Sequence, residues 1–547
     1  MTGVQTCALP IFMLESRDLT TSGANISYRY DRKTLSRSFP NLDADLVTMT
    51  LFASIADPSG QSSYAARVVA LLGIELLAPP LPSPSVSYSF AGSAGLTRTT
   101  AGNSNLVSVG YGRIQPAPSG AAPAGLAIFS LRQDNRLVSE AAVPASRAIP
   151  SGRIYAEIGN GVDTGIAFAN PNTLAAVITF SFTDESGASF GSGSTTIPAG
   201  GQLARFLSQA PFNGGASARG TFSFTSTQPV GAIALRGFTN ERSQFLITTL
   251  PVVDISASTT APIILPQVAD GGGWTTQILL VNPTDQPLTG NMSFLDSQGQ
   301  PLPVTIASQQ DSTFNYAVAA RSSRKFQTAG ESETIRIGSV KIVPSPATPT
   351  PTALAVFAFK QGGITVTETG VRGERASSSL RVYAEFSGTA GGPGSIQTGV
   401  AIANPANADI RVDFELTNLA GVSSGLRGST VVPRNGQTAV FLNQIPGFES
   451  LRAPFQGLLH ITTTSSSGVA VAGLRGRYNE AGDFLVATTP PVDETAVASS
   501  VELLFPHWAD GAGYTTQFIL FNPGSAVSSG TLRLFSVFGV QLDLGLR

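Results

Sequence analysis

Thr164-Gly-Ile-Ala-Phe-Ala-Asn-Pro171 is the stretch that decides the fold, because it returns with two changes as Thr398-Gly-Val-Ala-Ile-Ala-Asn-Pro405. Upstream, Arg153–Glu157 (RIYAE) returns as Arg381–Glu385 (RVYAE), an offset of 228 residues. Each copy reads as an apolar strand that stops at Asn-Pro, and proline ends a strand because its nitrogen cannot donate to the neighbouring strand. We call the unit that carries these segments module A.

A second repeated segment defines module B. Ala269–Gln277 (ADGGGWTTQ) returns as Ala509–Gln517 (ADGAGYTTQ), and both copies run into an apolar strand that ends at Asn282-Pro283 or Asn522-Pro523. Modules A and B share the strand and Asn-Pro pattern, so the structural unit is half the offset, about 114 residues.

Short strands separated by turns fill each unit. Ala176–Phe182 alternates apolar and polar residues, as a strand with one buried face does. Val230–Leu235 and Ala353–Phe359 are continuous apolar runs suited to central strands. Roughly seven such segments per unit predict an immunoglobulin-like sandwich. The predicted fold class is therefore all-β, a tandem array of immunoglobulin-like β-sandwich domains joined like beads on a string by short linkers.

The repeats also predict the domain boundaries. Met1–Ile11 resembles a translated sequencing adapter, so we expect an artefact that takes Cys7 with it and leaves the true N-terminus unseen. Residues 12–50 match neither module. The expected order is then a degenerate or truncated B-like sandwich at 51–152, module A at 153–260, module B at 261–380, module A at 381–498 and a truncated module B at 499–547.

Composition argues against several function classes. Only 12% of the residues are charged, against roughly 25% in globular proteins. A net charge of -2 offers no electrostatic footprint for nucleic acid. Two histidines and one cysteine leave little catalytic or metal-binding chemistry, so we expect no enzyme activity, no metal and no cofactor. No apolar run is long enough for a transmembrane helix in this fragment.

The remaining candidate site residues are the two histidines and the residues of the Ala-Asp-Gly segment. His460 and His507 stand where the earlier copies have Ser223 and Gln267, so we expect two surface residues and no repeated Ser-His-Asp site. The segment around Asp270 could be a calcium loop, but one carboxylate is few for calcium, and a glycine-driven turn is the favoured interpretation. Trp274 and Tyr514 would then make rim contacts, with an exposed sugar-stacking platform as the alternative.

Each full module also carries an acid before its first long strand and a base on or just after its late apolar strand. We predict an intradomain ion pair near the rim of each module, with independent solvated charges as the alternative. The predicted pairs are Glu157 with Arg236, Asp270 with Lys360, and Glu385 with Arg475.

At the level of the strand–Asn-Pro and Ala-Asp-Gly-Gly-Gly-Trp-Thr-Thr segments, residues 96–547 resemble tandem sandwich modules of uncharacterised bacterial secreted or surface proteins. The resemblance implies a secreted or cell-surface location and a non-enzymatic role, as a repeat-domain spacer or an adhesive binding array for glycans or surface proteins. The alternative is a carbohydrate-binding or positioning region of a larger secreted enzyme whose catalytic domain lies outside this fragment.

Overall fold

The computed structural model describes residues 47–56, 63–72, 85–118, 120–256, 258–497 and 499–547. The adapter-like residues 1–11, with Cys7, and residues 12–46 lie outside the described residues. The chain divides into two compact units, Phe12–Pro84 and a larger one that contains Ser85–Arg547. In the smaller unit, β1 (Val47–Ala56) pairs antiparallel with β2 (Ser63–Leu72).

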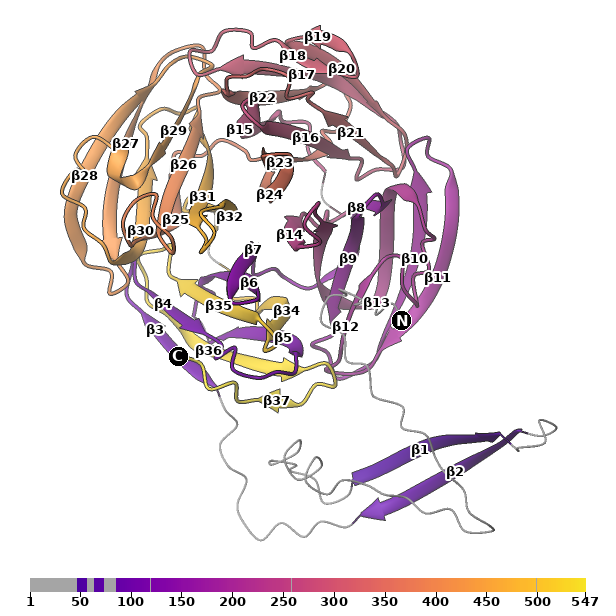
Figure 1. Ribbon diagram of the computed structural model, residues 1–547. Coiled ribbons are helices and arrows are strands. Elements are labelled where there is room, and N and C mark those ends of the chain that lie inside the picture. Colours follow the sequence, from indigo (N-terminus) through magenta and orange to yellow (C-terminus); the bar gives the residue numbers. More distant parts are fainter. Residues whose placement is uncertain (1–46, 57–62, 73–84, 119, 257, 498) are drawn as a thin grey trace. The chain divides into compact units, whose positions relative to one another are not determined.

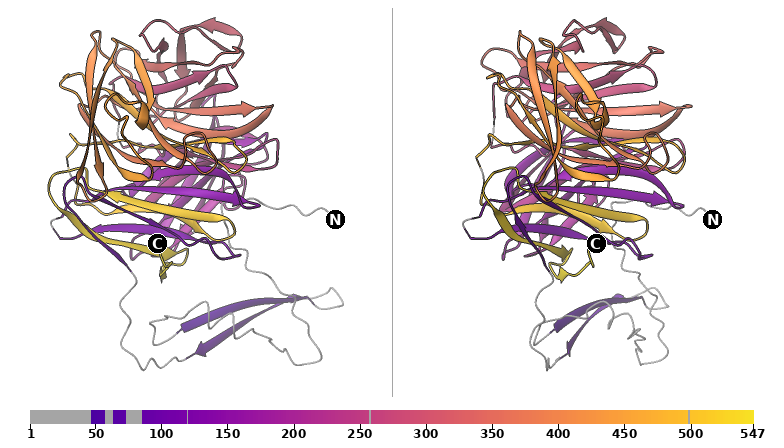
Figure 2. Two further views of the ribbon diagram at one scale, coloured as in Figure 1. Left: turned by 60° about the vertical axis from the view of Figure 1, so that its left-hand side comes forward. Right: turned by 90° about the vertical axis from the view of Figure 1, so that its left-hand side faces the viewer.

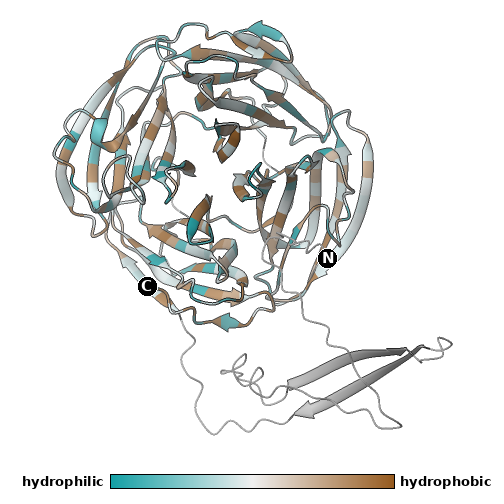
Figure 3. Ribbon diagram, in the orientation of Figure 1, coloured by the Kyte–Doolittle hydropathy of each residue, from teal (hydrophilic) through white to brown (hydrophobic). Residues whose placement is uncertain are grey.

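The predicted all-β class is confirmed. Among the described residues, the helical element is one 3-10 turn, Leu442–Gln444, and everything else that is regular is strand. No helix in that part of the chain is long and apolar enough to cross a membrane. Along many strands hydrophobic and hydrophilic residues alternate, as one-sided burial requires (Figure 3).

The unit Ser85–Arg547 is a ring of four sandwich modules (Figure 1, Figure 2). The first A module has strands β8 (Ile149–Gly159), β9 (Val162–Ala169), β10 (Ala176–Asp184), β11 (Ser189–Ile197), β12 (Gln202–Phe206), β13 (Ala218–Thr239) and β14 (Phe245–Leu250). The first B module has β15 (Ile263–Asp270), β16 (Trp274–Val281), β17 (Leu288–Asp296), β18 (Val304–Ile306), β19 (Gln309–Asp311), β20 (Thr313–Val318), β21 (Ser323–Gln327), β22 (Arg336–Pro344), β23 (Thr352–Gln361) and β24 (Ile364–Arg372).

The second A module has β25 (Ser379–Ser387), β26 (Ile396–Ala403), β27 (Ile410–Asn418), β28 (Ser423–Val432), β29 (Gln437–Phe441), β30 (Phe455–Thr462), β31 (Ala470–Tyr478), β32 (Phe484–Thr489) and β33 (Val492–Asp493). The fourth, which we call the closing B module, has β3 (Val86–Phe90), β4 (Gly95–Thr99), β5 (Ser108–Pro116), β6 (Ala124–Gln133), β7 (Arg136–Pro144), β34 (Leu503–Asp510), β35 (Tyr514–Phe521), β36 (Ser528–Ser536) and β37 (Gln541–Leu542).

Each module has two layers of strands. The first B module shows them plainly, as one sheet of order β15-β22-β17-β20 and a second of order β21-β16-β23-β24. In the first A module the 22-residue β13 takes part in both layers, pairing with β10 and β8 in one and with β9 and β14 in the other. The predicted array of sandwiches is therefore present, with one strand of each second layer lying at the ring axis.

Strands from both ends of the chain build the closing B module. Strand β36 lies between β3 and β5, and β35 lies between β4 and β6. The prediction treated 51–152 and 499–547 as two separate incomplete sandwiches. The structure instead joins residues 85–144 and 503–542 into one module, because each segment supplies strands that the other lacks, while β1 and β2 belong to the smaller unit.

The modules are also not separate beads, because their hydrophobic cores continue from one module to the next. Along β13, Ala232 and Ala234 pack in the core of the first A module. Ile233 and Leu235 point the other way, into the core of the closing module. Both faces of this central strand are buried, so the predicted beads on a string are replaced by a ring.

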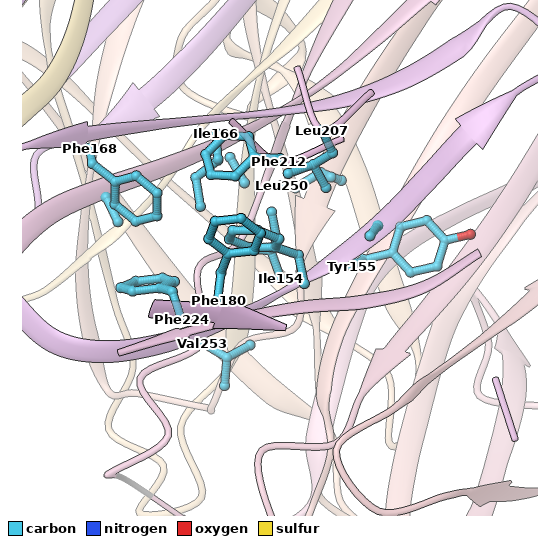
Figure 4. Packing of buried hydrophobic residues seen from close by; sticks show 14 of the residues in the cluster. Ile154, Tyr155, Ile166, Phe168, Phe180, Leu207, Phe212, Phe224, Leu250 and Val253 are labelled. Carbon is cyan, nitrogen blue, oxygen red and sulfur yellow. The ribbon is translucent and has the colours of Figure 1, made fainter. Parts of the chain in front are cut away.

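Aromatic side chains fill the core of the first A module (Figure 4). Phe180 packs edge-on against Phe212 with ring centroids 5.2 Å apart, and Phe168 meets Phe224 in the same way at 4.7 Å. Leu354 and Val356 of the first B module join this core. Such packing makes the boundary between the two modules part of the hydrophobic interior.

The repeated Asn-Pro motif ties each loop to a strand end. The side-chain amide of Asn404, which is 2% exposed, donates to the carbonyls of Ala408, Val432 and Pro433. The equivalent donors in the other modules are Asn170, Asn282 and Asn522. Asparagine recurs here because its amide satisfies buried carbonyls that the proline stop leaves without a strand partner.

Candidate functional site at the ring axis

Four strands, one from each module, surround the ring axis. They are β7, β14, β24 and β32, and each contacts the next around the ring (Figure 1). Hydroxyl groups join them in equivalent pairs: the N–H of Ile247 donates to Ser139 Oγ, and the N–H of Val486 donates to Thr367 Oγ1. The hydroxyls of Thr249 and Thr488 donate to the carbonyls of Ala142 and Gly370.

A buried ionic cluster joins the first A module to the first B module. Arg236 donates to Glu157 at 2.8 Å, as the sequence prediction pairs them, and also to Glu368 on β24 at 3.1 Å. Lys325 donates to the other oxygen of Glu157 at 2.6 Å. Arg236 is 4% exposed, so the cluster lies inside a module interface rather than at a solvated rim.

The second A module makes the equivalent cluster with the closing module. Arg475 donates to Glu385, its predicted partner, and to Glu140 on β7 at 3.2 Å. Arg477 donates to the other oxygen of Glu140 at 2.8 Å. Arg475 and Glu140 are both buried. Each cluster thus combines a pair within one module with a carboxylate from the next.

Charge pairing outweighs burial in both clusters. Burial alone would raise the pKa of Glu157 and Glu140, but the facing arginines hold each pKa below its usual value. The pKa of Arg475 is raised in spite of its burial, because Glu140 and Glu385 stabilise its charge. Groups that fixed partners hold in the ionised form can fix the alignment of neighbouring modules. They are poor proton donors or acceptors.

The third predicted pair does not form. Asp270 binds Arg336 at 2.5 Å and accepts the N–H of Gly330 at 2.9 Å, whereas Lys360 binds Glu241 at 3.2 Å. Asp270 is 3% exposed, and both its oxygens are taken by the protein. The prediction failed here because Arg336 lies on the paired strand β22, directly opposite Asp270 in register.

The predicted rim aromatics take different positions. Trp274 begins β16 and stacks on Phe359 with ring centroids 4.7 Å apart and an interplanar angle of 25°. Tyr514 begins β35 and is partly buried against the core of the closing module. One face of Trp274 is therefore used inside its own module, which is the packing contact that the sequence favoured.

The two histidines depart from the expectation of surface residues. His507 is 2% exposed and accepts the Gln202 amide on Nδ1 at 3.1 Å, across the interface with the first A module. Burial lowers its pKa to about 4. His460 is half-buried and binds Glu494 at 2.6 Å and Ser379 at 3.1 Å, but both contacts use Nε2. Serine and carboxylate on one nitrogen do not form a catalytic relay, which needs the two ring nitrogens separately.

A cavity of about 290 Å³ opens at one end of the axis. It lies at the C-terminal ends of the four inner strands, where Pro144, Leu250, Arg372 and Thr488 contribute to its wall. Most of the lining is apolar, and Arg372 and Glu374 are its charged residues. Burial raises the pKa of Glu374 to about 7, with Asp493 adding to the rise and Arg372 opposing it.

Acidic side chains lie at the other end of the inner strands. Glu241 accepts the N–H of Thr365 at 2.7 Å, and Glu480 accepts the N–H of Leu137 at 2.8 Å. These contacts cross from an A module to the following B module. Burial favours a higher pKa at both carboxyls, yet the backbone N–H groups, Lys360 at Glu241 and Arg132 at Glu480 bring each pKa to about 2.

Sequence reasoning missed the carboxylates of the inner strands. Glu140 and Glu368 are separated by the repeat offset of 228 residues, and so are Glu157 and Glu385. That shared offset was the available signal. Glu374 had no such signal, because Ser146 occupies the equivalent position in the other B module. Across the described residues, no group of three or more His, Cys, Asp or Glu side chains is placed to hold a metal.

Comparisons with known proteins leave the family open. No protein-family model matches the chain, and no curated protein matches it. The solved structures found include a T13 viral particle of IBDV, 8% identical over 71% of this chain and 76% of that chain with a TM-score of 0.11. The VP2 subviral particle of infectious bursal disease virus is 8% identical over 71% of this chain and 79% of that chain, with a TM-score of 0.10. Scores this low carry no argument about fold or function.

Proposed function

We propose that this is a non-enzymatic bacterial binding protein, secreted or displayed on the cell surface, whose closed ring of modules presents its turns to a glycan or protein on another surface. One observation carries the proposal: β35 and β36 insert between strands from the opposite end of the chain. A spacer gains length when modules are joined end to end, and a closed ring gains none. Of the two roles expected from the repeats, the geometry therefore favours binding.

Shared cores support this role. The side chains of β13 that pack into two modules at once hold neighbouring modules at fixed angles. Loops fixed in this way lose little conformational freedom when they meet a partner, which favours affinity. Binding loops on a rigid β-scaffold are a common arrangement.

The test is a binding measurement with the full chain. We expect saturable binding either to a defined glycan on an array or to intact cells, and abolition of cell binding by periodate or by protease treatment of those cells. The treatment that abolishes binding identifies the chemical class of the partner. Absence of saturable binding in both formats, or protein-dependent conversion of a bound glycan or protein into product, would contradict the proposal.

A further inference from the structure

The axial cavity is a composite site that no single module could make. Its wall includes Val143 of the closing module, Ile233 of the first A module, Val371 of the first B module and Ala472 of the second A module. Its volume of about 290 Å³ is close to the lower limit of about 300 Å³ for small-molecule sites. Small-molecule sites have this character, with apolar walls and a few polar groups that converge.

Three polar side chains at this cavity make no side-chain hydrogen bond to any residue that the structure describes. Ser146 Oγ is buried and makes no hydrogen bond with any described residue. Within the same described ranges, neither the half-buried Glu374 nor the exposed Arg372 makes a side-chain hydrogen bond or a close ion pair, although the charge of Arg372 opposes the rise in the pKa of Glu374. A buried hydroxyl such as that of Ser146 is normally satisfied, and an exception calls for water, an ion or a ligand. Glu374 and Arg372 add two charges at the same cavity that remain free to pair with a ligand.

The charges also break the two-fold repeat of the ring. Pro144 and Ser146 occupy the positions that Arg372 and Glu374 hold in the first B module, 228 residues further on. Registry of the ring therefore does not require the two charges, since the closing module does without them. Residues 372 and 374 are two apart along an extended segment, so both project to the same side, roughly 7 Å apart at their Cα atoms.

We propose that this cavity binds a small amphoteric molecule of the apolar α-amino acid class. The ammonium group of the ligand pairs with Glu374, and its carboxylate pairs with Arg372. The apolar side chain of the ligand packs against Val143, Ile233 and Leu354. Ser146 Oγ supplies a further hydrogen bond. The site is separate from the turns that we propose bind a surface partner, so it stands or falls independently of that function.

Charge complementarity selects this class over simpler ligands. A purely apolar ligand would leave Glu374 and Ser146 without partners, which costs binding free energy. An amine without a carboxylate would feel the repulsion of Arg372, and an acid without an amine would face Glu374. Because Glu374 has a pKa of about 7, an ammonium that pairs with it would displace a proton near neutral pH.

The experiment is isothermal titration of the full chain at pH 7 with L-valine, L-leucine and L-phenylalanine, up to about 10 mM, which covers millimolar dissociation constants. For leucine the matched analogues are 3-methylbutylamine, which lacks the carboxylate, and 4-methylpentanoate, which lacks the amine. We expect at least one amino acid to bind with one-to-one stoichiometry. We expect both analogues to bind about tenfold more weakly than leucine.

Two variants and a control locate the site. Glu374→Gln should weaken amino-acid binding about tenfold and abolish the proton release seen when titrations in two buffers of different ionisation enthalpy are compared. Arg372→Gln should weaken the binding of leucine and leave the binding of 3-methylbutylamine unchanged or make it tighter. Glu333→Gln, at an exposed loop carboxylate, is the matched control and should change neither.

Three results would overturn the assignment. They are no binding by any of the three amino acids, binding of 4-methylpentanoate as tight as that of leucine, or unchanged affinity and proton release in Glu374→Gln. Melting temperatures of all variants, measured alongside, show that each ring is folded, so a lost affinity is not a lost fold. None of these results bears on the binding of a glycan or a cell surface, which the full chain can retain in every case.

Discussion

Buried charges at the residue scale hold neighbouring modules together. Arg236 and Arg475 each face one carboxylate of their own module and one of the next. Burying such charges costs free energy, and their attraction to the partner charges offsets this cost only when every partner is present. Removing one member of a buried cluster should therefore lower the free energy of unfolding strongly, whereas removing one member of an exposed pair should change it little.

Arg475→Met tests this cost directly. The change leaves Glu140 and Glu385 buried without their shared partner, so the free energy of unfolding should fall by about 3–5 kcal/mol. Urea denaturation followed by fluorescence measures it. The matched control is Arg411→Met in the exposed pair with Asp413, for which a change within about 1 kcal/mol is expected. Equal effects of the two substitutions would show that the buried cluster contributes no more than a surface pair.

His507 makes the ring sensitive to acid. Its pKa is about 4 in the folded chain, below the ordinary value of 6.5, so the unfolded chain takes up a proton first. The stability that this residue contributes is complete above pH 6.5 and falls as the pH drops towards 4, by up to about 3 kcal/mol. Glu374, with its raised pKa, acts in the opposite direction in the same window.

His507→Gln should remove this sensitivity, because Gln267 already occupies the equivalent interface position and bonds with Gln437. The difference in unfolding free energy between the two proteins, measured by urea denaturation from pH 7.5 down to 4.5, isolates His507 from Glu374. We expect the unfolding free energy of the variant to rise relative to that of the native protein as the pH falls. A constant difference across that range would mean that the histidine is solvated or charged in the fold.

At the scale of elements, two features of the strands explain the repeats. Continuous apolar strands such as β13 and β23 are buried on both faces, because one face packs within the module and the other against its neighbour. The Asn-Pro ends of β9, β16, β26 and β35 are held by buried asparagine amides. The apolar pattern of a strand thus reflects which of its faces are buried, and its Asn-Pro end marks where it stops.

Asn404→Ala tests the asparagine role. The substitution removes four hydrogen bonds, three donated by the side-chain amide and one that its oxygen accepts from the N–H of Ala406. It leaves the carbonyls of Val432 and Pro433 without their donor, so the free energy of unfolding should fall by about 1–3 kcal/mol. Asn407→Ala, three residues away and exposed, is the control and should change stability by less than about 0.5 kcal/mol. Comparable losses in both, measured by thermal and urea denaturation, would argue against a special role for the buried amide.

At the scale of the whole ring, the unit Ser85–Arg547 is closed by a seam between β3 and β36. Ser89 of β3 lies opposite Ser529 of β36 in the antiparallel register. Cross-strand partners have the Cα separation that a disulfide needs. The seam can therefore be locked by one covalent bond.

Ser89→Cys with Ser529→Cys, in a chain whose Cys7 is replaced by serine, should form an intrachain disulfide. We expect faster migration on a non-reducing gel and a rise of about 2–4 kcal/mol in the free energy of unfolding, reversed by reductant. Ser89→Cys alone is the control and should remain a monomeric thiol. Free thiols or disulfide-linked dimers in the double variant would show that the two ends do not meet within one chain.

The sequence by itself determined the local level of this structure. Period-two apolar patterns, Asn-Pro stops and the 228-residue offset predicted β-strands, sandwich modules and their alternation, because these depend on residues close together in the chain. The same signals predicted the pairs Glu157 with Arg236 and Glu385 with Arg475, whose strands repeat together in both A modules.

Only the tertiary structure decided how the modules meet. Ring closure, the partner of Asp270, the burial of His507 and the axial cavity all depend on contacts between residues that lie up to hundreds of positions apart. A strand pattern reports that a face is apolar, and it does not report whether that face covers its own module or the next. The central strands bury one face in their own module and the other against the neighbouring module. For this physical reason the modules form a ring and not the predicted string.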